Sequence, residues 1–535
     1  MGVAVPERLL VVKRFALLVI PALLAANLAV ASGTSVVLAG GNVDTVTVPV
    51  LGGPLGNITT SPLTLSPAFD QATTDYVLRC HTGVNAVQVT LSAASSGEIA
   101  IGKDRGNSLT INVNLVENQA LIISGPGQRG ANRASASAQS GQTDSAQPSG
   151  LAQYWIRCLP SDFPLINVTR PGNPPTGWYV TGTLYAAVGA YAMVLDSNGT
   201  PVWYRKSGGL NAVNVTPLPD GSLAWVSDAQ QGFGVDPNAR FEDYNLATQT
   251  TTFLAAPEPP LDFHELQAMS NGDLMMLSSP LKRNVDMSSL GFGSNVTIVD
   301  CLLQEVDPGG AVVWQWRASD HISVSESLHP FATHVSGELV YEPFHCNSVD
   351  TNPRSSEILL SARHTDAVYM INKSSGKIIW RLGGGTRPGL DNEPILTMEG
   401  DPDGAFHGQH DARFQPNGEV SLFDDESWDA SLAARAVVYR IDVASGTATL
   451  IWSYQSPDGH NVPATGSFRR LDGGSDNVIG WGVKPNTMFT EVDSNGNVMM
   501  NVTFPNGEDT YRVIKVGLGA LDHNLLRATA GLPRQ

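Results

Sequence analysis

Short segments in which apolar and polar residues alternate recur along most of the chain. The clearest are VQVTLSA at 87–93 and LTINVNL at 109–115. A period of two is typical of a strand that is buried on one face. Turn-forming residues are frequent, with 53 Gly and 34 Pro, and only 15% of residues are charged, which favours short strands over long amphipathic helices. The pattern predicts an all-β protein.

A pair of elements repeats between about residues 170 and 520. The first is a turn that carries Asp or Asn, usually with Gly, followed by β-branched residues and often Trp; its six copies are at 194–204, 242–254, 305–316, 370–382, 440–454 and 491–504. The second is a polar turn before a strand, at 217–228, 268–279, 355–365, 414–425 and 471–482. Repeats of about 50 to 70 residues with about four strands each are typical of propeller blades. The six copies predict a six-bladed β-propeller over 170–520, with Trp203, Trp314, Trp380 and Trp452 packing its blades.

A different pattern precedes these repeats. Residues 55–162 contain short alternating strands and are predicted to form a small immunoglobulin-like β-sandwich. Within this region, LSPAFDQATTDYVL at 65–78 resembles the opening of cadherin-like β-sandwich repeats. Residues 125–150 are low in complexity and lack large apolar side chains, so they are expected to form a flexible loop. A chain of 535 residues with 42% hydrophobic content is long enough for these two domains.

The first 31 residues have the features of a secretory signal. Arg8, Lys13 and Arg14 precede an apolar run that ends in the small residues of 29–31, AVA. The run is slightly long, so an uncleaved N-terminal anchor is the alternative, and a membrane contact is expected only in that case. No later stretch is long and apolar enough to span a bilayer. We therefore expect a secreted or otherwise extracytoplasmic protein.

Four cysteines in an exported chain are expected to pair. Cys80 and Cys158 end two similar strand-like segments, which predicts one disulfide between them and a second between Cys301 and Cys346. Two buried free thiols are the alternative for the second pair. Seven N-x-[ST] sequons are compatible with a glycoprotein if the host is eukaryotic: Asn57, Asn167, Asn198, Asn214, Asn295, Asn372 and Asn501.

The net charge of −18 excludes one class of partner. Nucleic-acid binding draws its affinity from clustered Lys and Arg, and the chain has no such cluster. An anionic small molecule could still bind where a few cationic side chains converge. The oligomeric state stays open, with a homodimer as one option.

Histidine is the residue type that links the repeats to chemistry. Of the 11 histidines, six lie in polar or loop contexts and are expected to be exposed: His81, His321, His329, His334, His460 and His523. The others lie at or beside strands of the repeats. These stretches are DFHELQAMSNGDL at 262–274, FHCNSVD at 344–350, LLSARHT at 359–365 and GAFHGQHDARFQPNGEV at 404–420.

These stretches resemble the aryl sulfotransferase (arylsulfate sulfotransferase) family, and the resemblance covers most of residues 175–515. It implies a six-bladed propeller that moves a sulfuryl group from an aryl sulfate donor to a phenolic acceptor. The family uses no metal, nucleotide sulfate or other cofactor, and its intermediate is a sulfated histidine. By residue-to-residue match that histidine is His410, and His264, His345 and Arg363 line the same pocket.

The chemistry of these side chains agrees with that assignment. A neutral imidazole is a nucleophile near pH 7 and can later leave, so His410 suits covalent catalysis. Arg363 and His264 would bind the charged sulfuryl oxygens, and a fixed cation stabilises charge in the transition state. His345 or His264 would take the proton of the acceptor phenol. The spacing of His410 and its neighbours does not match a zinc site, so no metal is expected.

Strand periodicity separates neighbouring candidates. If LLSARHT is extended, Arg363 and His364 face opposite ways and only one can point inward, and the family match selects Arg363. His407 and His410 should face apart for the same reason, which leaves His407 as a structural residue with a smaller chance of touching substrate. Arg413 is expected to pair with Asp411 or with the acidic run at 424–426.

Two other functions are compatible with a propeller. The first is a secreted binding or adhesion protein without turnover, which the acidic insertion at 385–406 and the Ser-rich N-terminal region would suit. The second is a quinone-cofactor propeller, because SSGKIIW at 374–380 resembles the Trp-bearing repeats of such proteins. The absence of an evident calcium-ligand cluster in the sequence counts against the second.

Overall fold

The computed structural model describes residues 37–39, 45–94, 97–126, 151–186, 189–227, 236, 238–387 and 389–534. The signal predicted at 1–31 and nearly all of the loop predicted at 125–150 lie outside these residues. Strands predominate in the described part, and its one α-helix is α1 (His523–Thr529), so the all-β prediction is confirmed. Within the same part, no helix has the length and apolar character that a membrane span requires.

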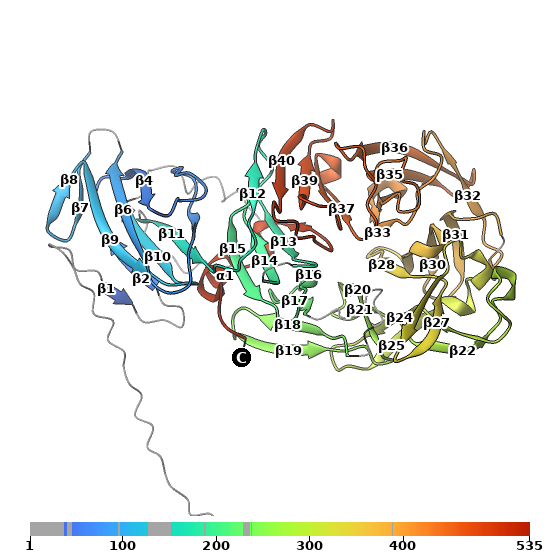
Figure 1. The fold of residues 1–535 in the computed structure, drawn as a ribbon. Coiled ribbons are helices and arrows are strands. Elements are labelled where there is room, and N and C mark those ends of the chain that lie inside the picture. The colour runs from blue at the N-terminus through green and yellow to red at the C-terminus, as the bar shows by residue number, and fades with distance from the viewer. Residues whose placement is uncertain are drawn as a thin grey trace, which may run out of the picture.

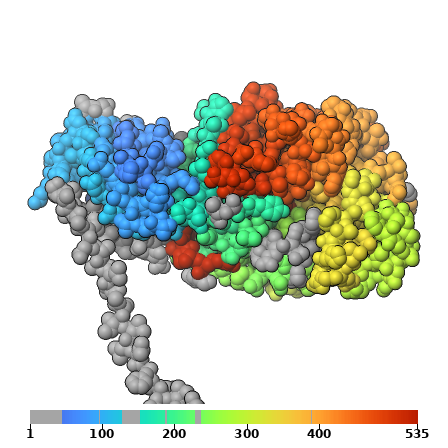
Figure 2. Space-filling model, viewed as in Figure 1, coloured from blue at the N-terminus to red at the C-terminus, as the bar shows by residue number. Residues whose placement is uncertain are grey.

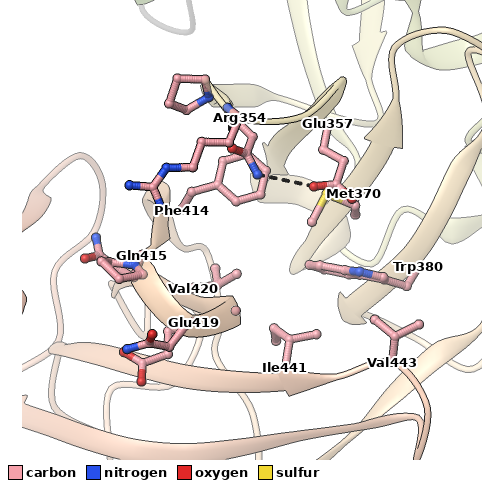
Figure 3. Close-up of a pocket in the computed structure, with 15 residues that line it drawn as sticks. Arg354, Glu357, Met370, Trp380, Phe414, Gln415, Glu419, Val420, Ile441 and Val443 are labelled. Atoms are coloured by element: carbon pink, nitrogen blue, oxygen red, sulfur yellow. Dashed lines mark hydrogen bonds between the residues drawn. The ribbon is translucent and has the colours of Figure 1, made fainter.

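The N-terminal region, blue in Figure 1, contains one five-stranded sheet and two three-stranded sheets. Strand β6 buries every second residue, as its alternating sequence predicts, and packs into one core with residues of the opposite sheet such as Ile123 and Ile156. The five-stranded sheet consists of β1 (Val37–Ala39), β2 (Thr45–Pro49), β10 (Ala120–Pro126), β11 (Leu151–Leu159) and β5 (Asp75–Arg79), in that order. The three-stranded sheets are β4 (Leu55–Ser61), β6 (Asn85–Ala93), β9 (Ser108–Leu115) and β3 (Leu51–Gly52), β7 (Ile99–Ile101), β8 (Asp104–Gly106).

The rest of the chain forms antiparallel sheets in which consecutive strands are neighbours. The first sheets are β13 (Trp178–Gly182), β14 (Tyr191–Leu195), β15 (Pro201–Lys206); β16 (Val213–Pro217), β17 (Leu223–Val226), β18 (Phe241–Asn245), β19 (Thr250–Leu254); and β20 (Leu261–Ala268), β21 (Leu274–Ser278), β24 (Leu302–Val306), β25 (Val312–Arg317). Next are β28 (Cys346–Thr351), β29 (Glu357–Ala362), β30 (Ala367–Asn372), β31 (Ile378–Gly383); β33 (His410–Gln415), β34 (Glu419–Asp424), β35 (Arg435–Asp442), β36 (Thr447–Gln455); and β37 (Ser467–Leu471), β38 (Asp476–Gly480), β39 (Phe489–Val492), β40 (Val498–Thr503).

Two additions interrupt this order. A separate sheet is inserted after β21 and contains β22 (Leu281–Val285), β23 (Val296–Val299), β27 (Glu338–Glu342) and β26 (Phe331–Val335). Strand β32 (Ile395–Glu399) lies between β31 and β36 and pairs in parallel with both, which joins two four-stranded units into one nine-stranded sheet.

Strands from both ends of this region close the arrangement. Strand β41 (Ile514–Val516) pairs with β13, and β12 (Asn167–Thr169) pairs with β40. The first sheet is thus completed by a late strand and the last sheet by an early one. Figure 1 shows the sheets around a common centre, with β16, β20, β28 and β33 nearest to it. Each sheet packs against its neighbours, so the inner strands are held by the whole ring.

The repeated turn sequence has a direct structural cause. In three copies, Oδ1 of the turn Asp accepts hydrogen bonds of 2.8–2.9 Å from the backbone N–H groups two and four residues later; these residues are Asp196, Asp307 and Asp493. The residue three positions after each Asp is a Gly with φ of 76–87°, a region that favours glycine: Gly199, Gly310 and Gly496. The turn chemistry therefore repeats because the backbone geometry repeats.

The recurrent Trp residues connect adjacent sheets, as predicted. Trp314 on β25 donates its Nε1–H to the Lys373 carbonyl (3.0 Å), and Trp452 on β36 donates to the Ser494 carbonyl (3.1 Å). Each acceptor lies in a turn of the following sheet. Trp203 and Trp380 are almost fully buried.

Helix α1 links the C-terminal segment to the N-terminal region through Asp75. Arg527 donates from Nε (2.8 Å) and Nη2 (2.7 Å) to the Asp75 carboxylate, and His523 Nε2 lies 3.0 Å from the same group. Burial raises the pKa of Asp75, but the hydrogen bonds with His523 and Arg527 and the positive charge of Arg527 outweigh it, so its net pKa lies below the usual range. Asp75 therefore stays ionised in the folded protein.

Replacing Asp75 with Asn should lower the free energy of unfolding at pH 7 by about 3–5 kcal/mol, because Arg527 would remain buried without its counter-charge. A carboxyl group whose pKa is lower in the folded state stabilises above its unfolded pKa of about 4 and loses that contribution as the pH falls. The difference in the free energy of unfolding between wild type and variant should therefore become smaller below pH ~4. Urea unfolding followed by circular dichroism measures both effects. The exposed Glu399→Gln variant is the control, and equal losses in the two variants would contradict the prediction.

Candidate functional site

The four residues predicted to share a pocket come from three neighbouring four-stranded units, two of which β32 joins into one sheet. His264 lies on β20, His345 precedes β28, Arg363 follows β29, and His410 begins β33. All are buried, with exposed fractions of 4%, 7%, 6% and 2% in that order. Polar side chains are rarely this buried without partners, so their contacts decide what they can do.

Contacts between the sheets bring these residues together. The rings of His264 and His345 meet edge to face with centres 4.9 Å apart, and the Arg363 N–H donates to the His345 carbonyl (2.9 Å). The Asn347 side chain donates to the Gln409 carbonyl (2.6 Å), which fixes the residue before His410 against β28. Burial lowers the pKa of His410, and the positive charge of Arg363 acts in the same direction.

His410 is held through one ring nitrogen. Its Nδ1 lies 2.8 Å from Oδ2 of Asp425 and 3.1 Å from the Gly408 carbonyl. A carbonyl only accepts hydrogen bonds, so Nδ1 carries the proton and the lone pair is on Nε2. Burial is the main reason that the pKa of His410 lies well below its usual range. Burial also raises the pKa of Asp425 well above the usual range of an aspartate. The result is a neutral imidazole with a defined tautomer.

His264 has a comparable arrangement. Its Nδ1 is 2.5 Å from Oδ1 of Asp262, whose other oxygen accepts from the Ser279 hydroxyl (2.7 Å). The backbone N–H of His264 also donates to Asp262 (3.0 Å). The ring is therefore fixed in orientation on an irregular part of β20, where the pairing with β21 shifts register.

His345 belongs to a second cluster of titratable groups. Its Nδ1 is 3.0 Å from Oε2 of Glu342, and its ring lies 4.8 Å from that of His364. Burial raises the pKa of Glu342 to about 7 and lowers the pKa values of His345 and His364, the latter to about 3. At neutral pH the two imidazoles are uncharged and Glu342 can give or take a proton. Atoms of these three residues lie within 4.8 Å of one another, a grouping that could hold a metal ion, and strand spacing had not indicated it.

Arg363 and His364 do not face opposite ways, so that prediction was wrong. Residues Arg363–Thr365 form the short 3-10 turn η5, and the alternation of an extended strand does not apply to them. Both side chains are buried, and Arg363 Nη1 is 3.3 Å from His364 Nε2. Arg363 also donates to the Pro463 carbonyl (2.8 Å).

An aromatic side chain connects Arg363 to solvent. The guanidinium carbon of Arg363 is 4.4 Å from the ring centre of Trp428, a cation–π contact. Trp428 is 40% exposed, stacks on His329 (4.2 Å between centres), and donates to Asp366 (3.1 Å). The Trp428 indole therefore forms a partly exposed apolar surface beside the buried Arg363 guanidinium.

His407 differs from His410 in its exposure and in the direction of its pKa shift. It lies in the loop before β33 with a side chain 33% exposed, and Nδ1 is 2.9 Å from Oε2 of Glu426. The hydrogen bond with Glu426 is the main reason that the pKa of His407 is raised to about 9. His407 is therefore a cation at neutral pH. Its predicted structural role fits this ion pair, and a contact with substrate stays a prediction.

Several side chains are paired where the sequence suggested otherwise. His321 lies 3.0 Å from Asp391, His329 is 2.8 Å from Asp366, and His523 contacts Asp75, so these three are not simply exposed. Arg413 binds Asp411, one of its two predicted partners, and Glu265 rather than the acidic run at 424–426. That run instead supplies Asp425 to His410, because the adjacent strands β33 and β34 pair and bring their open ends together.

Both predicted disulfides are present. Cys80 pairs with Cys158, and Cys301 pairs with Cys346, which excludes free thiols at these positions. Cys346 directly follows His345, whose φ is 51°. The second bridge therefore anchors the loop that carries His345 to the start of β24.

The fold and the pocket define the class of this protein: an all-β protein in which buried histidines and one arginine meet between radial sheets. Residues 169–512 match the model of the arylsulfotransferase (ASST) family. The chain belongs to this family. A search of curated proteins finds no significant match.

Solved structures with similar backbones are distant. AztD from Citrobacter koseri is 10% identical, with 64% of this chain and 98% of that chain covered and a TM-score of 0.32. The β-propeller domain of Cps50 (Swd1) from Myceliophteria thermophila is 10% identical, with 58% and 93% covered and a TM-score of 0.32.

The two neighbouring histidines should differ in charge at pH 7. His410 should be neutral with its proton on Nδ1, because its pKa is lowered by burial, whereas His407 should be protonated on both nitrogens because its pKa is about 9. Long-range ¹⁵N–¹H correlation spectra of the imidazole rings distinguish these states, with His410→Asn and His407→Asn providing the assignments. A charged His410, or a proton on its Nε2, would show that the assigned tautomer is wrong.

Proposed function

We propose that this chain transfers a sulfuryl group from an aryl sulfate ester to a phenolic acceptor through a sulfated His410. Family membership supports the reaction class. We also propose that the repeated sheets form a six-bladed β-propeller and that the N-terminal region is an immunoglobulin-like, cadherin-like sandwich. The strand order supports six units, since each set from β13 to β40 has four strands once β41 is added to the first.

The observation that carries the mechanism is the state of His410. Asp425 and the Gly408 carbonyl occupy Nδ1, which leaves the lone pair on Nε2 in a neutral, buried ring. A nucleophile needs this unprotonated nitrogen, and burial keeps it unprotonated across the physiological pH range. His407, three residues away, is charged and lacks a free lone pair.

In the first step, His410 Nε2 attacks the sulfur of the aryl sulfate. The N–S bond forms, the bond from sulfur to the aryl oxygen breaks, and the electron pair of that bond leaves with the phenolate. The phenolate takes a proton from the Glu342–His345 pair, because a carboxyl with a pKa of about 7 is partly protonated at neutral pH. The N-sulfated ring is cationic, and its Nδ1–H faces Asp425, which stabilises that charge.

The second step reverses the first with a different phenol. The acceptor oxygen attacks sulfur, its proton returns to the Glu342–His345 pair, and the N–S bond breaks to restore neutral His410. The sulfuryl oxygens are negative throughout, and Arg363, whose Nη1 lies 3.3 Å from His364 Nε2, is the fixed cation proposed to bind them. Trp428, which covers the Arg363 guanidinium, is placed to contact the aromatic part of donor and acceptor.

An extracytoplasmic location is proposed for the same protein. The two disulfides support it, since such bonds persist in oxidising compartments. Nothing in the described residues favours the adhesion or quinone-cofactor alternatives.

Incubation with 4-nitrophenyl sulfate should add the mass of one SO₃ group to the protein, and His410→Asn should abolish both the adduct and turnover. His407→Asn is the matched control, because it removes a nearby imidazole that is protonated and therefore cannot act as the nucleophile. It should keep most of the activity. Intact-protein mass spectrometry and nitrophenolate release measure the two outcomes. An active His410→Asn protein, or active wild type that never carries the adduct, would refute the mechanism.

Replacing Asp425 with Asn should lower kcat by about 100-fold or more while changing KM little, because an amide can donate to Nδ1 and move the ring proton to Nε2. Asp425 acts on His410 and not on substrate, so it is a positioning residue. Asp429→Asn, an exposed change in the following turn, is the control. Loss through KM alone, or an unchanged pH profile with full kcat, would exclude this role for Asp425.

A further inference from the structure

A second cavity lies at the other end of the inner strands. It has a volume of about 390 Å³ and is lined by residues of β16, β20, β33, β37 and β41. On β20 the cavity begins at Glu265, just after His264, and continues to Ala268; on β33 it is lined by Arg413, three residues beyond His410. Because a strand advances about 3.3 Å per residue, the cavity is displaced along the strands from the histidine pocket.

A network of ion pairs separates the two spaces. Arg512 donates to Glu265 (2.8 Å) and to the His264 carbonyl (3.2 Å), and Arg413 donates to Asp411 (2.7 Å) and Glu265 (2.5 Å). All four charged side chains of this network are buried. The network lies between the histidine pocket on one side and the cavity on the other.

Two guanidinium groups at this network, Arg469 and Arg512, have a buried Nε without a hydrogen-bond partner among the described residues, and Arg469 is the one that lines the cavity. Its Nη2 donates to Asp411 (2.9 Å), whereas its buried Nε has no hydrogen-bond partner among the described residues. By contrast, Arg413 uses all three of its nitrogens, and Arg512 uses both Nη groups. The Arg469 side chain is 20% exposed and lines the cavity. A partly satisfied guanidinium fork at a cavity wall matches an oxyanion.

The surrounding charges leave Arg469 under-compensated. Asp411 is shared by Arg469 with Arg413 and Arg512, the latter through Nε at 3.3 Å. Asp350, the other acid near Arg413, accepts hydrogen bonds from the Gln267 side chain and the Phe414 backbone. Burial and the charge of Arg413 lower the pKa of Arg469 to about 10, still far above neutrality. Arg469 is therefore a cation whose carboxylate partner, Asp411, also pairs with two other arginines.

The remaining wall combines the apolar side chains of Leu218, Leu266, Ile514 and Val516 with the polar side chains of Thr216, Glu265 and Gln267. We propose that this cavity is a second anion site, in which Arg469 binds a sulfate-type oxyanion that is either free or attached to an apolar group. The site is distinct from the histidine pocket, and its occupancy does not depend on whether the proposed reaction is correct.

Calorimetric titration of the full chain with sodium sulfate and with sodium benzenesulfonate, at ionic strength matched by sodium chloride, tests the proposal. Benzenesulfonate carries the same oxyanion but has no transferable group. Arg363→Gln serves as the background because it weakens binding in the histidine pocket. This background should still bind at least one probe, and adding Arg469→Gln should weaken that binding by about ten- to 100-fold, the loss expected for a charged hydrogen bond.

Two further results decide the interpretation. Tighter binding of benzenesulfonate would identify an ester-type ligand, and binding of sulfate alone would identify the free anion; either supports the site. If Arg469→Gln does not fold, Ala268→Glu places a carboxylate at the cavity wall and should cause the same loss, whereas Ala332→Glu on exposed β26 should not. Binding of neither probe to the background would overturn the proposal. The proposal would also be overturned if adding Arg469→Gln left the affinity of the background for both probes unchanged. Equal affinities of the Ala268→Glu and Ala332→Glu proteins would overturn it as well.

Discussion

The buried ion-pair network that connects the inner strands is the constraint on which the rest depends. Glu265 comes from β20, Asp411 and Arg413 from β33, and Arg512 from the segment before β41. Removing one member of a buried pair leaves an uncompensated charge, so these strands must stay in register together. Because Arg512 also donates a hydrogen bond to the His264 carbonyl, the same network fixes the position of His264 in the histidine pocket.

Burial has opposite consequences on the two sides of this network. Below it, opposite charges neutralise one another and the arginines stay protonated. Above it, burial removes charge from His345 and His410, and each ring is instead oriented by a carboxyl group through Nδ1. A pocket built this way presents unprotonated ring nitrogens beside the permanent cation Arg363, a combination that suits nucleophilic attack on a negatively charged sulfur ester.

Local patterns in the sequence predicted what local forces determine. Alternation and Asp–Gly turns gave the strands and repeats, and the paired segment endings gave the disulfides. Partners set by tertiary structure were not predictable: Asp366 at His329 and Asp75 at His523 come from remote segments, and Asp425 reaches His410 from the end of the paired strand β34. The alternation rule failed at Arg363 because the chain turns there into a 3-10 segment, and no residue nearby signals that turn. The acidic run at 424–426 was visible, but its target was not.

The bond between Cys301 and Cys346 makes the site sensitive to where the chain folds. His345 lies beside Cys346 in a left-handed backbone conformation that a non-glycine residue adopts at a cost. Without the bridge, the loop would be free to relax from that conformation. In a newly made chain in a reducing compartment, the loop that carries His345 would therefore not yet be fixed in the pocket. Oxidation in the proposed extracytoplasmic compartment would complete the site, so the proposed sulfuryl transfer would depend on that compartment.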